Sequence, residues 1–195
     1  MVNDNLLALA STLFDQEVGK SGTNERKLGQ IVDIHDSKRI PLSSRQRENM
    51  EKTYPYYGAA SKMDYVDKYL FDGIYLLLGE DGTVISEKGF PILQYVWGKF
   101  WVNNHAHVLT GRNEITTEML YLLLSKTSVK NIVTGAVQPK INQENLKSLK
   151  VVLPSENIIK ELSNKIAPLF KLYRLHSEEN KRLEKLRDIL LSKLF

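Results

Sequence analysis

The residues best suited to chemistry lie between positions 36 and 47, where basic side chains gather in a polar stretch. They are Lys38, Arg39, Arg45 and Arg47, with Gln46 among them. Lysine and arginine can neutralise phosphate groups, and arginine or glutamine can also read the edge of a base through paired hydrogen bonds. The stretch therefore favours a contact with nucleic acid. The alternative is a solvated surface loop, which is the usual setting of a run of charges.

No catalytic motif accompanies this cluster. The chain has no glycine-rich cofactor loop, no Asn/Asp-Pro-Pro-Tyr string for methyl transfer to an amino group, and no phosphate-binding loop of the Walker type. His105 and His107 share one face of an extended strand, but a metal site would need further ligands and the chain has no cysteine. Asp15 and Asp36 match the acidic spacing of a metal-dependent nuclease only loosely. We therefore expect a protein that has no catalytic activity, cofactor or metal of its own.

The composition is that of a globular protein, with 195 residues of which 42% are hydrophobic and 26% charged. Residues 155–195 hold nine basic and six acidic side chains, whereas residues 1–154 hold 18 and 17. Because the first part is nearly neutral, a DNA site there must be a local patch, or a partner must help to hold the phosphates. No apolar run reaches the roughly 18 residues of a membrane span. The absence of cysteine and of a secretory leader predicts a cytoplasmic location.

The order of elements predicts an α+β protein in three parts. Residues 1–22 read as an amphipathic helix, with apolar side chains at helical spacing and glycines after it. Residues 23–154 read as a mixed, β-rich domain with short helices. Residues 155–195 read as one long C-terminal helix of the coiled-coil type, which begins at a capping serine, Ser155.

Within the middle part, glycines and prolines divide the chain into short elements. We expect strands over residues 84–86, 91–97 and 100–102, with Gly89 and Gly98 marking turns. Apolar spacing and the capping threonines Thr116 or Thr117 predict a helix over Ile115–Lys130. A short helical turn over Gln143–Leu149 should lead into a strand that ends at Pro154.

The long helix carries an apolar seam whose positions recur at intervals of three and four residues, as in a coiled coil. The predicted dimerisation residues on this seam are Ile159, Leu162, Ile166, Leu169, Tyr173, Asn180, Leu183, Leu186 and Leu190. Asn180 could fix the register of a paired helix, and Pro168 could kink or restart the helix. So long a helix cannot hide its leucines on a small domain, which indicates a partner helix. The alternative is a helix that folds back on its own domain.

Two strings in the middle part are distinctive. Residues 53–62 read Thr-Tyr-Pro-Tyr-Tyr-Gly-Ala-Ala-Ser-Lys, and residues 133–141 read Val-Thr-Gly-Ala-Val-Gln-Pro-Lys-Ile. Between them lie an apolar stretch that ends in Gly-Glu-Asp-Gly and the string Trp-Val-Asn-Asn-His. Glycine permits positive φ or a close approach, and a glutamine amide both donates and accepts hydrogen bonds. A plain connection of loop, turn and strand could carry the same residues.

In this order, the strings resemble the target recognition domain in the specificity subunit of type I restriction–modification systems. In that family, a Gly, a Gln-Pro or similar pair and a short apolar strand that ends in proline lie before a long conserved helix. Leu6–Phe14 resembles the helix that precedes a recognition domain, and Lys27–Ile34 resembles the start of the domain. The resemblance covers nearly the whole chain, from Leu6 to Phe195.

The resemblance implies a subunit that reads DNA and performs no chemistry. It shows one recognition domain where the full-length family has two, as expected of a half-subunit or of part of a longer chain. The domain would read one half of a bipartite site in double-stranded DNA. The long helix would act as a spacer and dock a methyltransferase subunit that uses S-adenosylmethionine, while a restriction or motor subunit carries cleavage. A homodimer would favour an inverted-repeat site with a fixed gap.

We expect the DNA contacts in loops, at Lys38, Arg39, Arg45, Gln46, Ser61, Lys62, Thr134, Gln138 and Lys140. The competing hypothesis is a coiled-coil dimeric adaptor that binds protein and not DNA, which the near-neutral charge of residues 1–154 favours slightly. A standalone nuclease or methyltransferase is disfavoured by the missing motifs. The DNA sequence that is read, and whether another chain supplies a second recognition domain, stay open at this point.

Overall fold

The computed structural model describes residues 2–20 and 24–194. Its elements are, in order, α1 (Val2–Lys20), β1 (Asn24–Lys27), the 3-10 helix η1 (Leu28–Gln30), β2 (Val32–Ile34), the 3-10 helix η2 (Asp36–Lys38), α2 (Ser44–Glu48), β3 (Tyr54–Tyr57), β4 (Lys62–Val66), β5 (Phe71–Gly79), β6 (Leu93–Val102), β7 (Ala106–Gly111), α3 (Thr117–Leu124), α4 (Gln143–Ser148), β8 (Lys150–Leu153) and α5 (Glu156–Leu194). The predicted boundary between residues 22 and 23 lies outside the described residues. No described helix is long and apolar enough to cross a membrane.

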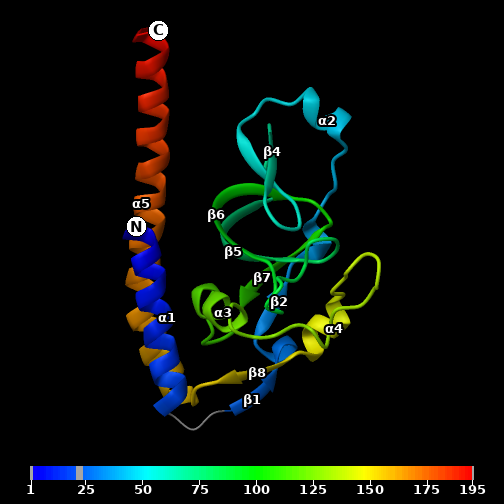
Figure 1. The fold of residues 1–195 in the computed structure, drawn as a ribbon, viewed down its shortest axis with the longest axis vertical. Coiled ribbons are helices and arrows are strands. Elements are labelled where there is room, and N and C mark those ends of the chain that lie inside the picture. Colours follow the sequence, from blue (N-terminus) through cyan, green and yellow to red (C-terminus); the bar gives the residue numbers. More distant parts are fainter. Residues whose placement is uncertain (1, 21–23, 195) are drawn as a thin grey trace.

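Six strands form one sheet in the order β2-β7-β5-β6-β3-β4, which makes up the body of the domain (Figure 1). Its neighbouring strands are antiparallel except β3 and β6, which run parallel where Tyr56 lies opposite Trp101. The longest ladder joins Phe71–Leu78 of β5 to residues 93–100 of β6. Together with the helices, this sheet confirms the predicted α+β fold with a β-rich domain and a long C-terminal helix.

Strand β5 is buried on both faces, which explains its unbroken apolar run. Leu76 and Leu78 lie in the main core, with residues of α1, α3 and α5. Leu77 points the other way, into a second cluster that contains Phe100 and Val108. Successive side chains of a strand alternate between faces, so a strand covered on both sides needs apolar residues at every position.

Two strand predictions within this sheet are wrong. The predicted turn at Gly98 is a point inside the single strand β6, where Gly98 pairs with Gly73 of β5. Both glycines have positive φ, +78° and +137°, so the ladder passes through a backbone conformation that other residues adopt only with strain. Residues 84–86 form no strand, because Ile85 makes only an isolated bridge to Pro91.

The helix predicted over residues 115–130 exists but is shorter, and spans Thr117–Leu124. Thr116 is its N-cap, and the threonine hydroxyl accepts a hydrogen bond from the Met119 N–H at 3.3 Å. The expected helical turn and strand before Pro154 are both present as α4 and β8.

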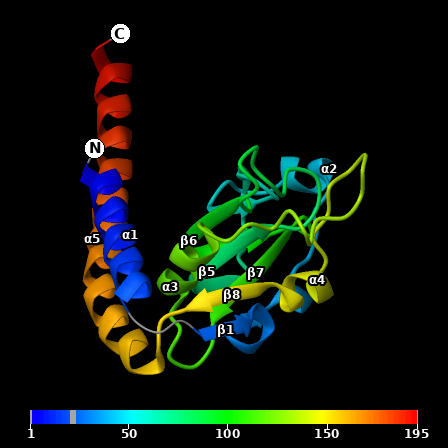
Figure 2. The same cartoon turned by 60° about the horizontal axis from the view of Figure 1, so that its bottom comes forward.

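The two ends of the domain lie together. β1 pairs with β8 in antiparallel fashion, from Asn24 opposite Leu153 to Lys27 opposite Lys150. α1 then packs along the first half of α5 (Figures 1 and 2). Three seam residues of α5, Ile159, Leu162 and Ile166, are buried in the core that α1 shares, and Leu169 and Tyr173 are partly buried. The first half of the seam is therefore covered by other residues of the same chain. For this half, the alternative of a helix that packs on its own domain is the one observed.

The second half of α5 stands apart from the domain, with a hollow between it and β4, and only its end rises past α2 (Figure 1). The helix continues through Pro168 without a break, and its side chains from residue 179 to 193 are all exposed. Its last side-chain contacts with the sheet are made near Trp97, whose Nε1 donates to Glu178 Oε1 at 2.9 Å and whose ring lies under Lys181. The seam residues Asn180, Leu183, Leu186 and Leu190 thus remain uncovered within this chain.

The two halves of α5 should respond differently to the same substitution. Leu162→Ala removes a side chain that is fully buried, and is expected to lower the free energy of unfolding by about 2–5 kcal/mol. Leu191→Ala changes a side chain that is 47% exposed, and should lower it by less than about 1 kcal/mol. Urea unfolding of both variants at one dilute protein concentration measures the difference. Equal losses would contradict the packing of α5 against α1.

Candidate nucleic-acid interface

Four loops gather on the side of the domain that lies away from α5 (Figures 1 and 2). We call this surface the loop face, and it consists of residues 36–46, 80–82, 103–105 and 134–140. The first segment contains η2 and most of α2, the second follows β5, the third joins β6 to β7, and the fourth is a tight hairpin between α3 and α4.

Backbone hydrogen bonds hold these loops together. The Glu80 N–H donates to the His105 carbonyl at 2.8 Å, which joins the turn after β5 to the turn before β7. The Gly82 N–H donates to the Pro139 carbonyl at 3.0 Å, and the same turn is thereby joined to the hairpin. Trp101 Nε1 donates to the Ile40 carbonyl at 2.6 Å and fixes the segment that follows η2. The loop face is therefore a connected surface and not a set of independent loops.

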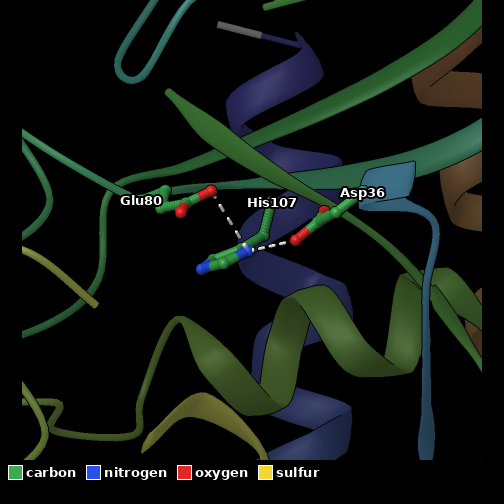
Figure 3. Close-up of side chains that lie close together, drawn as sticks. All are labelled: Asp36, Glu80 and His107. Carbon is green, nitrogen blue, oxygen red and sulfur yellow. Dashed lines mark hydrogen bonds and ion pairs between the residues drawn. The ribbon is translucent and has the colours of Figure 1, made fainter. Parts of the chain in front are cut away.

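Beneath the loop face lies a buried cluster of charges (Figure 3). His107 is fully buried, and its Nδ1 lies 2.6 Å from Asp36 Oδ2 and 3.7 Å from Glu80 Oε2. Arg39 Nη1 donates to Glu80 Oε2 at 2.7 Å, and Arg39 Nη2 lies 3.4 Å from Asp36 Oδ2. Lys140 Nζ lies 3.6 Å from the other Glu80 oxygen. Two carboxylates thus face the side chains of His107 and Arg39, with Lys140 nearer the surface.

The hydrogen bonds of this cluster fix the orientation of His107 and lower the pKa of Asp36. His107 Nε2 lies 2.8 Å from the carbonyl oxygen of Ile141, which can only accept, so this nitrogen carries a proton. The other ring nitrogen, Nδ1, faces the Asp36 carboxylate. Burial acts to raise the pKa of Asp36, but the hydrogen bond and charge of His107, with donors from Val108 and Gln143, hold the pKa below its ordinary value. The surroundings of Asp36 therefore favour its ionised form.

Asp36, Glu80 and His107 also have the donor atoms of a metal site, within 4.8 Å of one another. Both nitrogens of His107 are used by protein partners, and the Arg39 guanidinium occupies the space beside the two carboxylates. A divalent cation would have to displace a fixed positive charge. The arrangement is that of an ion-pair network, which ties η2, the end of β5 and β7 to each other.

Arg39 is the one predicted contact residue that lies inside the protein. Its side chain is only 12% exposed, and besides Glu80 it donates to the carbonyl oxygens of Asp36 at 3.1 Å and Ala106 at 2.6 Å. Because its donors are committed to these partners, Arg39 supports the loop face from below and does not reach DNA in this structure.

The structure places six predicted contact residues together on the loop face, and all six are exposed: Lys38, Arg45, Gln46, Thr134, Gln138 and Lys140. Thr134, Gln138 and Lys140 lie on a hairpin that is closed by two backbone hydrogen bonds of 2.8 Å between Thr134 and Lys140. Gly135 has a positive φ of +85°, which glycine adopts without strain. Gln46 has a second role, because its Oε1 accepts from the Ser43 N–H at 2.9 Å and completes the cap of α2.

Ser61 and Lys62 lie in and after the turn between β3 and β4. Ser61 is exposed. Lys62 Nζ donates to the Tyr65 hydroxyl at 2.7 Å and lies over its ring, in a hollow between β4 and the exposed half of α5. The Lys62 side chain therefore belongs to a different surface from the loop face.

One segment of the loop face contains no predicted contact although all its residues are polar: Asn103, Asn104 and His105. From the sequence, His105 is weighed only as a metal ligand, together with His107. In the structure the two histidines separate, since His105 is exposed and paired with Asp81 whereas His107 is buried. The signal for these residues is a polar run, Asn-Asn-His, directly after an apolar strand.

Comparisons with known proteins agree with this fold. A family model described as the type I restriction modification DNA specificity domain matches residues 20–185, and the chain therefore belongs to this family. It is 28% identical over 151 residues to the putative type I restriction enzyme specificity subunit S.HindORF215P of Haemophilus influenzae, which covers 77% of this chain and 38% of that protein. It is 29% identical over 97 residues to the HindI specificity subunit of the same organism, which covers 47% of this chain and 21% of that protein.

Solved structures show the same fold. The S subunit of a type I restriction–modification system from M. genitalium matches with a TM-score of 0.65 and 20% identity, over 99% of this chain and 56% of that one. A chain from a structure on complex assembly and conformational transition of the type I restriction–modification system matches with a TM-score of 0.50 and 14% identity, over 94% and 50%. The chain thus spans about half the length of these structural neighbours, and the predicted family and fold are confirmed.

The buried network makes a testable contribution to stability. Asp36→Ala leaves the buried His107 and Arg39 side chains without their shared partner, and should lower the free energy of unfolding by about 3–5 kcal/mol. Asp33→Ala is the matched control, because its pair with Arg112 is about half exposed and worth less than about 1 kcal/mol. Urea unfolding at neutral pH compares the two, and equal losses would contradict the network.

The pH dependence has a defined sign. Since the folded pKa of Asp36 is lowered, its stabilisation is fully present above the unfolded pKa near 4 and is lost as the pH falls through the folded value. The unfolding free energies of the wild type and Asp36→Ala should therefore converge below about pH 4.

Proposed function

We propose that this chain is the DNA-reading part of a type I restriction–modification complex and that it reads one half of a bipartite site through the loop face. The observation that carries the proposal is the loop face itself, in a chain that belongs to the specificity family. It presents exposed cations and amides on loops that a buried network fixes from below. Fixed donors at known positions are what the readout of base edges needs.

In this proposal the chain performs no catalysis. It docks a methyltransferase subunit, which brings S-adenosylmethionine, and a restriction or motor subunit carries cleavage. One structural neighbour comes from a structure on complex assembly of a type I restriction–modification system, which supports partners of this kind for the present chain. The chain spans 38% of the H. influenzae relative with 28% identity. A second recognition domain would come from a longer form of this chain, from a second copy or from another chain.

The exposed half of α5 supports pairing with a second copy. Along the whole of α5, seven apolar side chains are 43–59% exposed: Leu172, Leu175, Leu183, Leu186, Ile189, Leu190 and Leu191. Exposed leucines in this number on one helix mark an interaction surface. Leu172 and Leu175 lie on the part of α5 that α1 accompanies, so the uncovered stripe begins earlier than Asn180.

DNA binding by the loop face predicts a specific salt effect. The double variant Lys38→Gln/Arg45→Gln should bind all duplex sequences more weakly, and the slope of log K against log salt should fall by about two. Lys160→Gln/Lys171→Gln makes the same change of charge on exposed positions of α5 and should leave the slope unchanged. Fluorescence anisotropy over a salt series measures both. If the wild-type protein shows no salt-dependent binding to DNA, the result would favour the competing hypothesis of an adaptor that binds protein.

Pairing through α5 predicts a change of mass. Leu186→Ser/Leu190→Ser should shift the chain from dimer to monomer in sedimentation equilibrium, because both side chains are more than half exposed in the single chain. Lys185→Ser/Lys193→Ser changes neighbouring exposed positions of polar character and should remain dimeric. A monomeric wild type at high concentration, or a dimeric leucine variant, would contradict pairing through this stripe.

A further inference from the structure

A hollow of about 190 Å³ opens in the loop face where the start of α2, the β3–β4 hairpin and the turn before β7 meet. We call it the Asn103 pocket. Pro41, Leu42 and Met63 give it apolar walls, and Arg47, Asn103 and His105 line it with polar groups. Its volume corresponds to roughly six water molecules at about 30 Å³ each. The pocket is thus large enough to receive part of a ligand and has both apolar and polar walls.

The side chain of Asn103 is the central polar group of the pocket. The residue is only 4% exposed. Its Oδ1 accepts the His105 N–H at 2.8 Å, which fixes the orientation of the amide and turns Nδ2 toward Met63. Among the described residues, the only acceptor for Nδ2 is the Met63 thioether sulfur at 3.6 Å, which is a weak acceptor. A buried amide donor without a good acceptor is costly, so this group is suited to an incoming acceptor.

Arg47 supplies a second donor to the same pocket. Its Nη1 donates to Asp64 Oδ2 at 2.7 Å and its Nη2 to Ser44 Oγ at 3.2 Å, while the guanidinium lies 4.9 Å from the ring centre of Tyr56. These contacts hold the group in place. Its Nε is buried and has no hydrogen-bond partner among the described residues. Two fixed N–H donors, Asn103 Nδ2 and Arg47 Nε, therefore lack a strong acceptor on residues that line one pocket.

Met63 forms a movable wall in front of Asn103. It is 56% exposed, and its flexible thioether chain can change rotamer at little cost. Gly58 makes room for it, since a Cβ at position 58 would lie 2.3 Å from the Met63 sulfur. The glycine of the Tyr-Tyr-Gly string thus leaves room for Met63 in its present position, and its φ is not positive.

We infer that the Asn103 pocket reads the keto oxygen of a DNA base, O6 of guanine or O4 of thymine, from the major-groove edge. The inference rests on the proposed function and identifies which group of the loop face discriminates between bases. N–H groups that lack an acceptor favour the keto oxygen of guanine or thymine. At the same place on the major-groove edge, cytosine presents an amino donor, and adenine presents an amino donor beside its N7 acceptor. A phosphate fits less well, since the charge of Arg47 is already paired with Asp64. The exposed Arg45 lies on α2 near the pocket, where its side chain can contact a phosphate of the DNA backbone.

The test is a selection of duplex DNA from a randomised library, with wild-type protein and Asn103→Asp. The aspartate keeps the volume and the acceptor for the His105 N–H, but replaces the Nδ2 donor with an acceptor. The wild type should select a motif, and the position read by this pocket is the one at which Asn103→Asp changes the preference; a G·C preference there identifies guanine O6 and an A·T preference identifies thymine O4. In Asn103→Asp the preference at that one position should fall roughly 10- to 100-fold, while the other positions persist.

Controls keep the result decisive. Gln16→Glu makes the same amide-to-carboxylate change at an exposed position of α1, away from the pocket, and should select the wild-type motif with unchanged preference. Thermal unfolding checks that Asn103→Asp is folded, and Arg47→Lys serves if it is not, because lysine keeps a charge for Asp64 but lacks Nε–H and should weaken the same position. An unchanged motif in folded Asn103→Asp would overturn the inference and leave the proposed function standing. A wild type that selects no motif would overturn both.

Discussion

The loop face depends on the neutralisation of two carboxylates that lie inside the domain, Asp36 and Glu80. A buried charge is tolerated only when it is paired and hydrogen-bonded, and here the partners come from separate parts of the chain. His107 comes from β7 and Arg39 follows η2, while α4 contributes the amide of Gln143, which donates to Asp36 at 2.7 Å. Satisfying these charges fixes the positions of the loops above them, and fixed loops can present donors to DNA at defined places.

The long helix meets a different physical requirement in each of its halves. The first half buries Leu162, Ile166 and Phe170 against the rest of the chain and so anchors the helix to the domain. The second half keeps the same apolar spacing but finds no surface to cover it within the described residues. One continuous helix therefore joins the folded domain to an uncovered apolar arm, which suits a protein that must hold a recognition domain at a set distance from a partner.

Periodicity and turn residues were sufficient to predict the class of fold, the long helix, α4 and β8. They could not show what covers an apolar stripe, because the residues of α1 that cover the start of α5 lie about 150 positions away in the sequence. The same limit explains Arg39. Beside Lys38 it reads as a second phosphate contact, but its partner Glu80 lies 41 positions further on. Gly98 reads as a turn because its pairing with Gly73 depends on the register of two strands.

The most direct test of sequence readout by this chain is a map of adenine methylation. The chain is co-expressed with a type I methyltransferase subunit that binds it, in a host without other adenine methylation, and the genome is sequenced by a method that detects modified bases. The account predicts a gapped inverted repeat, with each half read by one copy. A gapped asymmetric site would contradict pairing of identical copies. No methylated motif, with the methyltransferase soluble and bound, would contradict readout by this chain.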